Sequence, residues 1–291
     1  MRKRYPTDLS NAEWNHIQPH MPAPKGFGRP RVHDLSEILN AVFYLLKSGC
    51  QWRMLTHDFP RWPTVYHYFR KWRIDGTWER INRAIRERLR VRLGRDPQPS
   101  AGVVDSQSVK STAVGGDRRG YDGGKKVKGR KRHILVDTEG LVLKAKVHSA
   151  KIMDYEGIKT LLTRADKVFP RLSHVWLDGG YRGEDKGADW VQKTLGWSAE
   201  LVERPRKPAP KEVLMAWARE WAKEGIALDW QKLMPVQGFV ILPRRWVVER
   251  TFSWIDKNRR MSKDYERLPE SGEAFIYVAM SRLMLRRLAR S

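Results

Sequence analysis

Residues 133–147 read His-Ile-Leu-Val-Asp-Thr-Glu-Gly-Leu-Val-Leu-Lys-Ala-Lys-Val, and this stretch decides the fold. Two apolar runs, 133–137 and 141–147, flank the turn residues Thr-Glu-Gly, which is the pattern of two strands joined by a hairpin. Another apolar run ends at Asp105, and a further one, His-Val-Trp-Leu-Asp, ends at Asp178. A stretch with helical spacing, which begins at Asp154, separates the run 141–147 from the run that ends at Asp178. The chain therefore predicts a mixed β-sheet flanked by helices, an α/β fold.

The order of these elements is strand, strand, strand, helix, strand, helix, strand and helix, and a short run near 201–203 is the fifth of these strands. Ribonuclease H-like domains have this order, so we expect a ribonuclease H-like mixed sheet. Pro97, Pro99 and Ser100 mark the point where the pattern changes from helical to strand-like. We therefore place a domain boundary there, with domains at 1–98 and 99–291. Several prolines interrupt the second domain, and we interpret 204–243 as an insertion within it.

The first domain is expected to be all-helical. Ser10 with Glu13 has the spacing of a capping box, and Asp34 with Glu37 repeats it. Apolar residues recur at helical spacing through 35–46, and Gly49 ends that run. We therefore expect short helices joined by tight turns.

A later helix, for which Thr64 is the expected cap, separates two kinds of side chain. Val65, Phe69 and Trp72 share one side, and the opposite side is basic, with His67, Arg70 and Lys71. A basic last helix in such a set is typical of a helix-turn-helix DNA-binding domain. The alternative is an ordinary helical bundle whose basic residues are only solvated.

Composition points to a polyanionic partner. The 291 residues carry a formal net charge of +24, which favours nucleic acid because phosphate contacts release counterions. The single cysteine, Cys50, excludes an intrachain disulfide and fits a reducing compartment. No apolar run approaches the ~20 residues of a membrane helix. The first residues lack a hydrophobic signal core, so we expect a cytoplasmic, nucleoid-associated protein with no membrane partner.

Three acidic residues are the candidate catalytic and metal-binding groups: Asp105, Asp178 and Glu249. The first two end apolar strands, and Glu249 lies on a late helix. Cleavage of a phosphodiester is served by two Mg²⁺ ions roughly 3.5–4 Å apart, and Mg²⁺ prefers carboxylate oxygens. We therefore expect these acids to hold two Mg²⁺ ions, or Mn²⁺ in their place. Asp137 competes with Asp105, but its position before Glu139-Gly140 favours a local role in the hairpin.

Basic residues near these acids are the candidate DNA contacts. Arg245 and Arg250 flank Glu249, although Arg245 could instead only orient its carboxylate. A Gly/Lys/Arg stretch between the first two strands supplies Lys125, Lys126, Lys128, Arg130 and Arg132. The alternative for that stretch is a solvated loop. In the insertion, Trp217 and Trp221 are expected to pack in the core; the alternative is that they stack on an unpaired or flipped base near the cut site.

The local wording around these residues is more specific than any one of them. Asp105-Ser-Gln-Ser-Val-Lys, Asp178-Gly-Gly-Tyr-Arg and the run 244–254, Arg-Arg-Trp-Val-Val-Glu-Arg-Thr-Phe-Ser-Trp, resemble DDE transposases of bacterial insertion sequences, in the IS4/IS5 superfamily. Lys128-Gly-Arg-Lys-Arg-His and the run 258–266 extend the resemblance. In the first domain it is carried by Gly28-Arg-Pro-Arg, the run 48–55 and the run 64–69. It covers nearly the whole chain.

This resemblance implies an enzyme that binds the terminal inverted repeats of its element, cleaves the DNA ends and joins their 3′-OH groups to target DNA. It implies double-stranded DNA as partner and a homodimer on DNA, because two ends are joined together. The family's signature has a Tyr and a Lys near the helical Glu, and here Leu242 and Asp256 stand in their places. The alternatives are a stand-alone nuclease of the same fold and a non-catalytic DNA-binding regulator.

Overall fold

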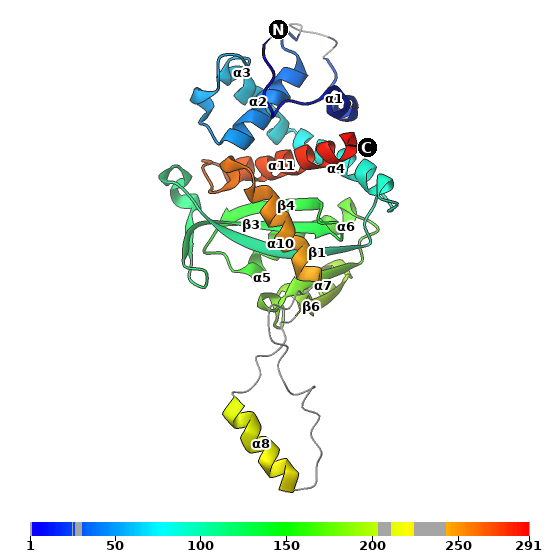
Figure 1. Ribbon diagram of the computed structural model, residues 1–291, viewed down its shortest axis with the longest axis vertical. Coiled ribbons are helices and arrows are strands. Elements are labelled where there is room, and N and C mark those ends of the chain that lie inside the picture. The colour runs from blue at the N-terminus through cyan, green and yellow to red at the C-terminus, as the bar shows by residue number, and fades with distance from the viewer. Residues whose placement is uncertain (1, 25, 27–30, 203–210, 224–242, 291) are drawn as a thin grey trace.

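The computed structural model describes residues 2–24, 26, 31–202, 211–223 and 243–290 (Figure 1). A group of helices from the first third of the chain lies on one side of a six-stranded sheet, and the last helix runs between them.

The first third is helical, as expected. Its elements are α1 (Asn11–Ile17), η1 (Gln18–His20), α2 (Leu35–Ser48), η2 (Trp52–Met54), α3 (Trp62–Ile74) and α4 (Thr77–Arg92). The Ser10–Glu13 capping box forms with both hydrogen bonds, and the Asp34 carboxylate caps α2. The cap predicted at Thr64 is wrong, because α3 already begins at Trp62 with Pro63 in its first turn.

The sheet contains parallel and antiparallel pairs. Its strands are β1 (Ala101–Lys110), β2 (Gly120–Asp122), β3 (Val127–Asp137), β4 (Val142–Ser149), β5 (His174–Asp178) and β6 (Ser198–Val202). The path runs β2-β3-β1-β5-β6, and β4 also pairs with β3. β1, β5 and β6 are parallel, whereas β3 is antiparallel to β1, β2 and β4. This confirms a mixed sheet with helices.

The two faces of the sheet belong to different cores because successive strand residues point to opposite sides. Val104, Leu135 and Leu177 face a core formed with the helices α5 (Asp154–Leu162), α6 (Ala165–Val168) and α7 (Gly187–Leu195). Val103 and Ile134 face the core that contains α10 (Pro243–Asp256) and α11 (Pro269–Ala289). Short 3-10 turns complete the order: η3 (Ala113–Arg118), η4 (Gly179–Tyr181) and η5 (Arg259–Met261).

The second core continues into the N-terminal helices. It includes residues of α2, α3 and α4 together with strand residues and most of α11. Figure 1 shows α11 crossing the molecule between these helices and the sheet, and its Phe275 stacks on Phe69 of α3 with ring centroids 4.5 Å apart. One hydrophobic core therefore spans the boundary that we drew at residue 98.

Most of the insertion predicted at 204–243 lies outside the described residues, as does Glu203 at the end of the strand predicted near 201–203. Within it the structure describes α8 (Lys211–Lys223), which Figure 1 shows apart from the sheet. Trp217 and Trp221 on α8 are 49% and 40% exposed, so the expectation that they pack in the core is wrong. None of the helices in the described part of the chain has the length and apolar character needed to span a membrane.

Candidate active site

Asp105 and Asp178 lie on neighbouring parallel strands and point to the same face of the sheet. Asp178 is the last residue of β5, but the expectation that Asp105 ends its strand is wrong, because β1 continues to Lys110. The pairing of β1 with β5 sets Val103 opposite Trp176, so the positions two residues further along both strands are also neighbours. Alternation then puts Asp105 on the face of Val103, and Asp178 on the face of Trp176. This is the face that α10 covers. Both aspartates line one small pocket together with Arg245 and Val248 of that helix.

Arg245 joins the third acid to this pair. Its Nη2 atom lies 3.8 Å from Asp178 Oδ2 and 3.7 Å from Glu249 Oε1. The Asp178 and Glu249 carboxylates thus both lie within 4 Å of the same guanidinium nitrogen. Glu249 is one helical turn beyond Arg245, and its side chain is exposed, whereas Asp105 and Asp178 are half-buried. The three acids therefore lie along the first half of α10, with the Arg245 guanidinium near them.

Electrostatically, the site is short of positive charge around Asp105. Burial raises the pKa of the Asp105 carboxyl to about 7, and the nearby Asp178 carboxylate contributes to this rise. The backbone N–H of Ser106, which donates to Asp105 Oδ1 at 2.7 Å, opposes it, as do Arg245 and Lys125. A carboxylate with such a raised pKa is one that an added cation would stabilise in its ionised form.

The donor chemistry fits a hard divalent cation, because the groups around the pocket are carboxylates. The side-chain positions do not complete such a site: within the described ranges, no three His, Cys, Asp or Glu side chains come together closely enough to hold a metal ion. Among the described residues, it is the Arg245 guanidinium, and no third carboxylate, that lies near both Asp178 and Glu249.

Asp137, the rival of Asp105, has a structural role. It is fully buried, accepts hydrogen bonds from the backbone N–H groups of Glu139 and Leu141, and forms an ion pair with Arg90 of α4. The hairpin interpretation is confirmed by those two backbone bonds, and the ion pair with α4 was not foreseen.

The basic stretch divides into an exposed and an internal part. Lys125, Lys126 and Lys128 are exposed, and Lys125 Nζ donates to the Ser106 carbonyl at 3.0 Å. This contact brings one lysine beside Asp105. Arg130 and Arg132 belong to the internal part, since both are buried in β3.

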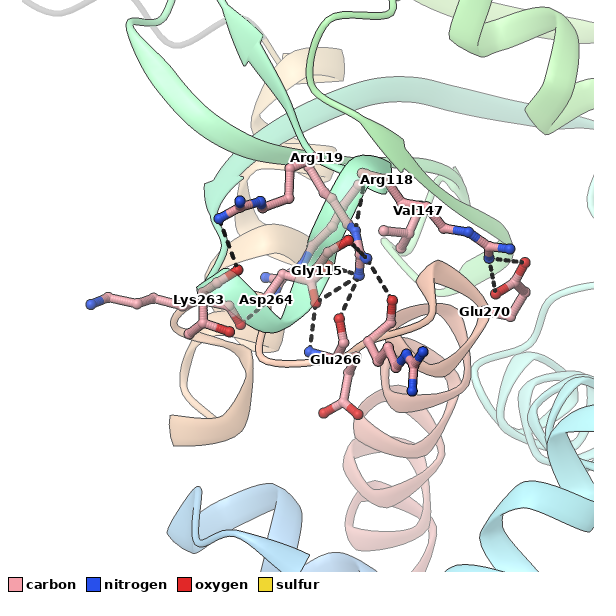
Figure 2. A network of polar contacts seen from close by, with 12 residues as sticks. Gly115, Arg118, Arg119, Val147, Lys263, Asp264, Glu266 and Glu270 are labelled. Atoms are coloured by element: carbon pink, nitrogen blue, oxygen red, sulfur yellow. Dashed lines mark hydrogen bonds and ion pairs between the residues drawn. The ribbon is translucent and has the colours of Figure 1, made fainter.

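Arg130 holds together two segments that are far apart in sequence. Its guanidinium forms an ion pair with Asp264 at 3.2 Å and donates to the carbonyls of Glu266 and Gly115. In Figure 2, Asp264 and Glu266, from the loop before α11, lie beside Gly115 of η3. Arg132 forms an ion pair with Asp256 and donates to the Met261 carbonyl at 2.7 Å. Both guanidinium groups are used inside the protein.

The remaining candidate DNA contacts are found on two helices. His67, Arg70 and Lys71 are all exposed on α3, while Val65, Phe69 and Trp72 on its other side are buried. On α10, Arg250 turns away from the site, donates to the Glu139 carbonyl at 3.0 Å and packs over Trp254. The structure therefore presents the α3 residues and the three lysines to solvent.

One residue near the site was missed as a functional candidate. Asp256, at the end of α10, accepts a hydrogen bond from Gln107 of β1 at 2.6 Å besides its ion pair with Arg132. Gln107 lies on the same face of β1 as Asp105, so Asp256 ties the helix of Glu249 to the strand of Asp105. The sequence did contain a signal for it, because Asp256 stands where the family's signature around the helical Glu has a Lys. Leu242, at the signature's Tyr position, lies outside the described residues.

Two family models match the chain. Residues 96–284 match the model described as "Transposase DDE domain", and residues 9–82 match "Putative transposase of IS4/5 family". The second match includes α3 and its basic face, and the first includes Asp105, Asp178 and α10. Comparisons with curated proteins and with solved structures find no match. Since the DDE model alone covers well over half of the 291 residues, the chain belongs to the DDE transposases of the IS4/IS5 family.

Proposed function

We propose that this transposase binds the terminal inverted repeats of an insertion sequence, cleaves the DNA at those ends and transfers the 3′-OH to target DNA with Asp105, Asp178 and Glu249 as its catalytic acids. One observation carries the proposal. Two aspartates from neighbouring strands and a glutamate on α10 gather around a single guanidinium, in a chain of a family whose domain is named for three such acids.

In this proposal the three carboxylates hold divalent cations, Mg²⁺ by preference. When bound, a pair of such ions neutralises charge at the phosphorus and activates the attacking oxygen. The raised pKa of Asp105 supports the assignment, because it indicates a carboxylate that lacks sufficient counter-charge in the protein alone. Arg245, at 3.8 Å from Asp178 and 3.7 Å from Glu249, supplies part of that charge to both carboxylates.

We assign the catalytic region to the ribonuclease H-like fold and the first third to a helix-turn-helix-like domain. The first assignment is supported by an antiparallel β3 beside the parallel strands β1, β5 and β6. The second is supported by α3, which buries one side and exposes His67, Arg70 and Lys71 on the other. We propose this exposed side, together with Lys125, Lys126 and Lys128, as the DNA-binding surface, and leave Arg130 and Arg132 out of it because they are buried.

The catalytic proposal is tested with an oligonucleotide that carries one end of the element and its flanking DNA. Asp105→Asn, Asp178→Asn and Glu249→Gln should each lower the rate of end cleavage by at least about 100-fold, since each removes a charged ligand from the transition state. DNA binding by the three variants should stay within about twofold of wild type. Glu184→Gln, which removes an exposed acid beyond the Asp178 turn, is the matched control and should cleave normally.

Two other functions give different results in the same assay. A stand-alone nuclease would cut the end but would not join a pre-cleaved 3′-OH end to a target plasmid. If the protein is a non-catalytic regulator, the wild type and all three acid variants will bind the DNA ends, and none of them will cleave. Cleavage by all four proteins at one rate would remove the assignment of the acids.

The DNA surface is tested by the salt dependence of binding. Replacing His67, Arg70 and Lys71 by alanine should weaken end binding and reduce the slope of log K against log salt by roughly 0.9 for each phosphate that is no longer neutralised. Lys167→Ala, an exposed lysine of α6 on the other face of the sheet, should leave the slope unchanged. An unchanged slope in the triple variant would exclude α3 from the interface.

We also propose that two protomers act together on DNA, because both ends of an element must be joined to one target. The mass of the complex between protein and end DNA measures this directly. A complex that joins ends while containing a single protomer would contradict it.

A further inference from the structure

Beneath the candidate site, on the face of the sheet away from α10, three polar side chains from three elements form a continuous chain. His148 of β4 lies with its Nε2 atom 2.9 Å from Nδ1 of His133 on β3. The other nitrogen of His133, Nε2, lies 2.7 Å from the hydroxyl of Tyr181 in η4. The chain ends at the backbone carbonyl of Ser149, 3.1 Å from His148 Nδ1.

The direction of every hydrogen bond in this chain follows from its last member. A carbonyl oxygen only accepts, so His148 Nδ1 carries the proton and donates. In a neutral imidazole the other nitrogen then accepts, so His133 donates from Nδ1 to His148 Nε2. By the same reasoning His133 Nε2 accepts, and the Tyr181 hydroxyl donates to it. All three bonds point one way, from Tyr181 to Ser149, and both imidazoles are neutral.

Burial favours this neutral state. It lowers the pKa of His133 to about 3, with further lowering by the adjacent His148, and it lowers the pKa of His148 as well. Lys131 and Lys125 add to the effect, whereas Asp154 opposes it. Gly157 of α5 closes the chain from the side, since a Cβ atom there would come within 2.5 Å of His133 Nδ1. The rings therefore have little room to turn.

The position of Tyr181 links the chain to the candidate active site. Tyr181 is buried and ends the turn that begins at Asp178, in which Gly179 and Gly180 are exposed. His133 pairs across the sheet with Ser106, the residue that follows Asp105. The turn that begins at Asp178 is thus hydrogen-bonded, through Tyr181, to His133 of β3, and β3 pairs with β1, the strand that carries Asp105.

We propose that Tyr181 is a positioning residue for Asp178, held by a one-way hydrogen-bond relay through His133 and His148 to the Ser149 carbonyl. The relay restrains the turn, which its two exposed glycines, Gly179 and Gly180, leave conformationally free. Its catalytic consequence rests on the proposed function, since a carboxylate displaced by about 1 Å can lower a rate by as much as 100-fold.

The variant that isolates this role is Tyr181→Phe, which keeps the buried ring and removes the donor. Nitrogen-15 NMR of labelled histidines in the full-length wild type should give both rings as neutral Nδ1–H tautomers at pH 7, and His133 should still be neutral at pH 5.5. In Tyr181→Phe the His133 Nε2 resonance should lose its hydrogen-bond shift. A charged ring or an Nε2–H tautomer at either histidine of the wild type at pH 7 would overturn the relay.

Hydrogen exchange measures positioning without any need for activity. Amides of residues 178–182 should exchange at least about tenfold faster in Tyr181→Phe than in wild type, and His148→Leu, at the half-buried end of the relay, should accelerate them less. Tyr155→Phe, on neighbouring α5, is the matched control and should leave exchange unchanged. Wild-type exchange in Tyr181→Phe would refute the positioning role.

End cleavage supplies the catalytic readout. Tyr181→Phe should lower the single-turnover rate by about 10- to 100-fold, with end binding unchanged. A wild-type rate in this variant would overturn the catalytic consequence. If the wild type itself does not cleave, the proposed function fails, and hydrogen exchange and the tautomers then decide the positioning role alone.

Discussion

Replacing Arg90 by methionine should destabilise the protein strongly, because the fully buried Asp137 carboxylate would lose its ion-pair partner. Arg90 Nη1 donates to Asp137 Oδ2; the Glu139 and Leu141 backbone N–H groups, at 3.0 and 2.8 Å, and the more distant charge of Arg86 would remain. Removing one partner of a buried ion pair costs about 3–5 kcal/mol. With an unfolding entropy of about 2.1 cal/mol/K per residue, the melting temperature should fall by about 5–8 °C.

The loss should depend on pH in a defined direction. Burial raises the pKa of Asp137 above its ordinary value, although the Leu141 N–H and Arg90 oppose this. A carboxyl whose pKa is higher in the folded state contributes stability that is present below its unfolded pKa and is lost as pH rises through the folded pKa. Arg90→Met raises the folded pKa further. The destabilisation should therefore be largest near pH 7 and should shrink toward pH 4.

Thermal unfolding of both proteins, followed by circular dichroism at pH 7 and pH 4.5, measures this effect. Arg95→Met is the matched control, because Arg95 pairs with Glu139 of the same hairpin at 3.4 Å but is exposed. Its loss should cost no more than about 1 kcal/mol. Equal melting temperatures for Arg90→Met and Arg95→Met at pH 7, or a difference that grows on acidification, would refute the reasoning.

Asp256→Ala should lower end cleavage about tenfold or more and should cost about 1–3 kcal/mol of stability, because the carboxylate joins α10 to Gln107 and is the ion-pair partner of the buried Arg132. Parallel rate and melting measurements check this, and a normal rate would contradict it. Gly157→Ala should lower the melting temperature, since its Cβ would overlap both imidazoles at a cost of about 1–3 kcal/mol, more than a helix gains from alanine. Gly123→Ala, where a Cβ meets open space, is its control and should melt within about 1 °C of wild type.

The location of both aspartates on strands, and the sheet itself, could be predicted because their signals are local. The continuation of β1 past Asp105 to Lys110 could not, because the residues that follow Asp105 are mostly polar. An apolar run that ends in Asp, as at Asp105 and Asp178, is visible in the sequence, and alternation fixes which side chains share a face. The capping box at Ser10 is equally local, and it forms as expected.

Arg130 and Arg132 could not be recognised as internal residues for the opposite reason. A run of basic residues with a glycine resembles a solvated loop, and only Asp264 and Asp256, more than a hundred positions later in the chain, make the burial of these arginines possible. Pairings over such separations leave no periodic pattern. The continuity of one core across residue 98 was hidden likewise, because it depends on α11.

The location of α11 sets an order on biosynthesis. During translation it is the last of the described elements to leave the ribosome, yet it contacts α1, α2, α3 and α4. The N-terminal helices therefore emerge first and remain without this packing partner until nearly every other element has been made. The core that they share with the sheet can be completed only after α11 has been synthesised.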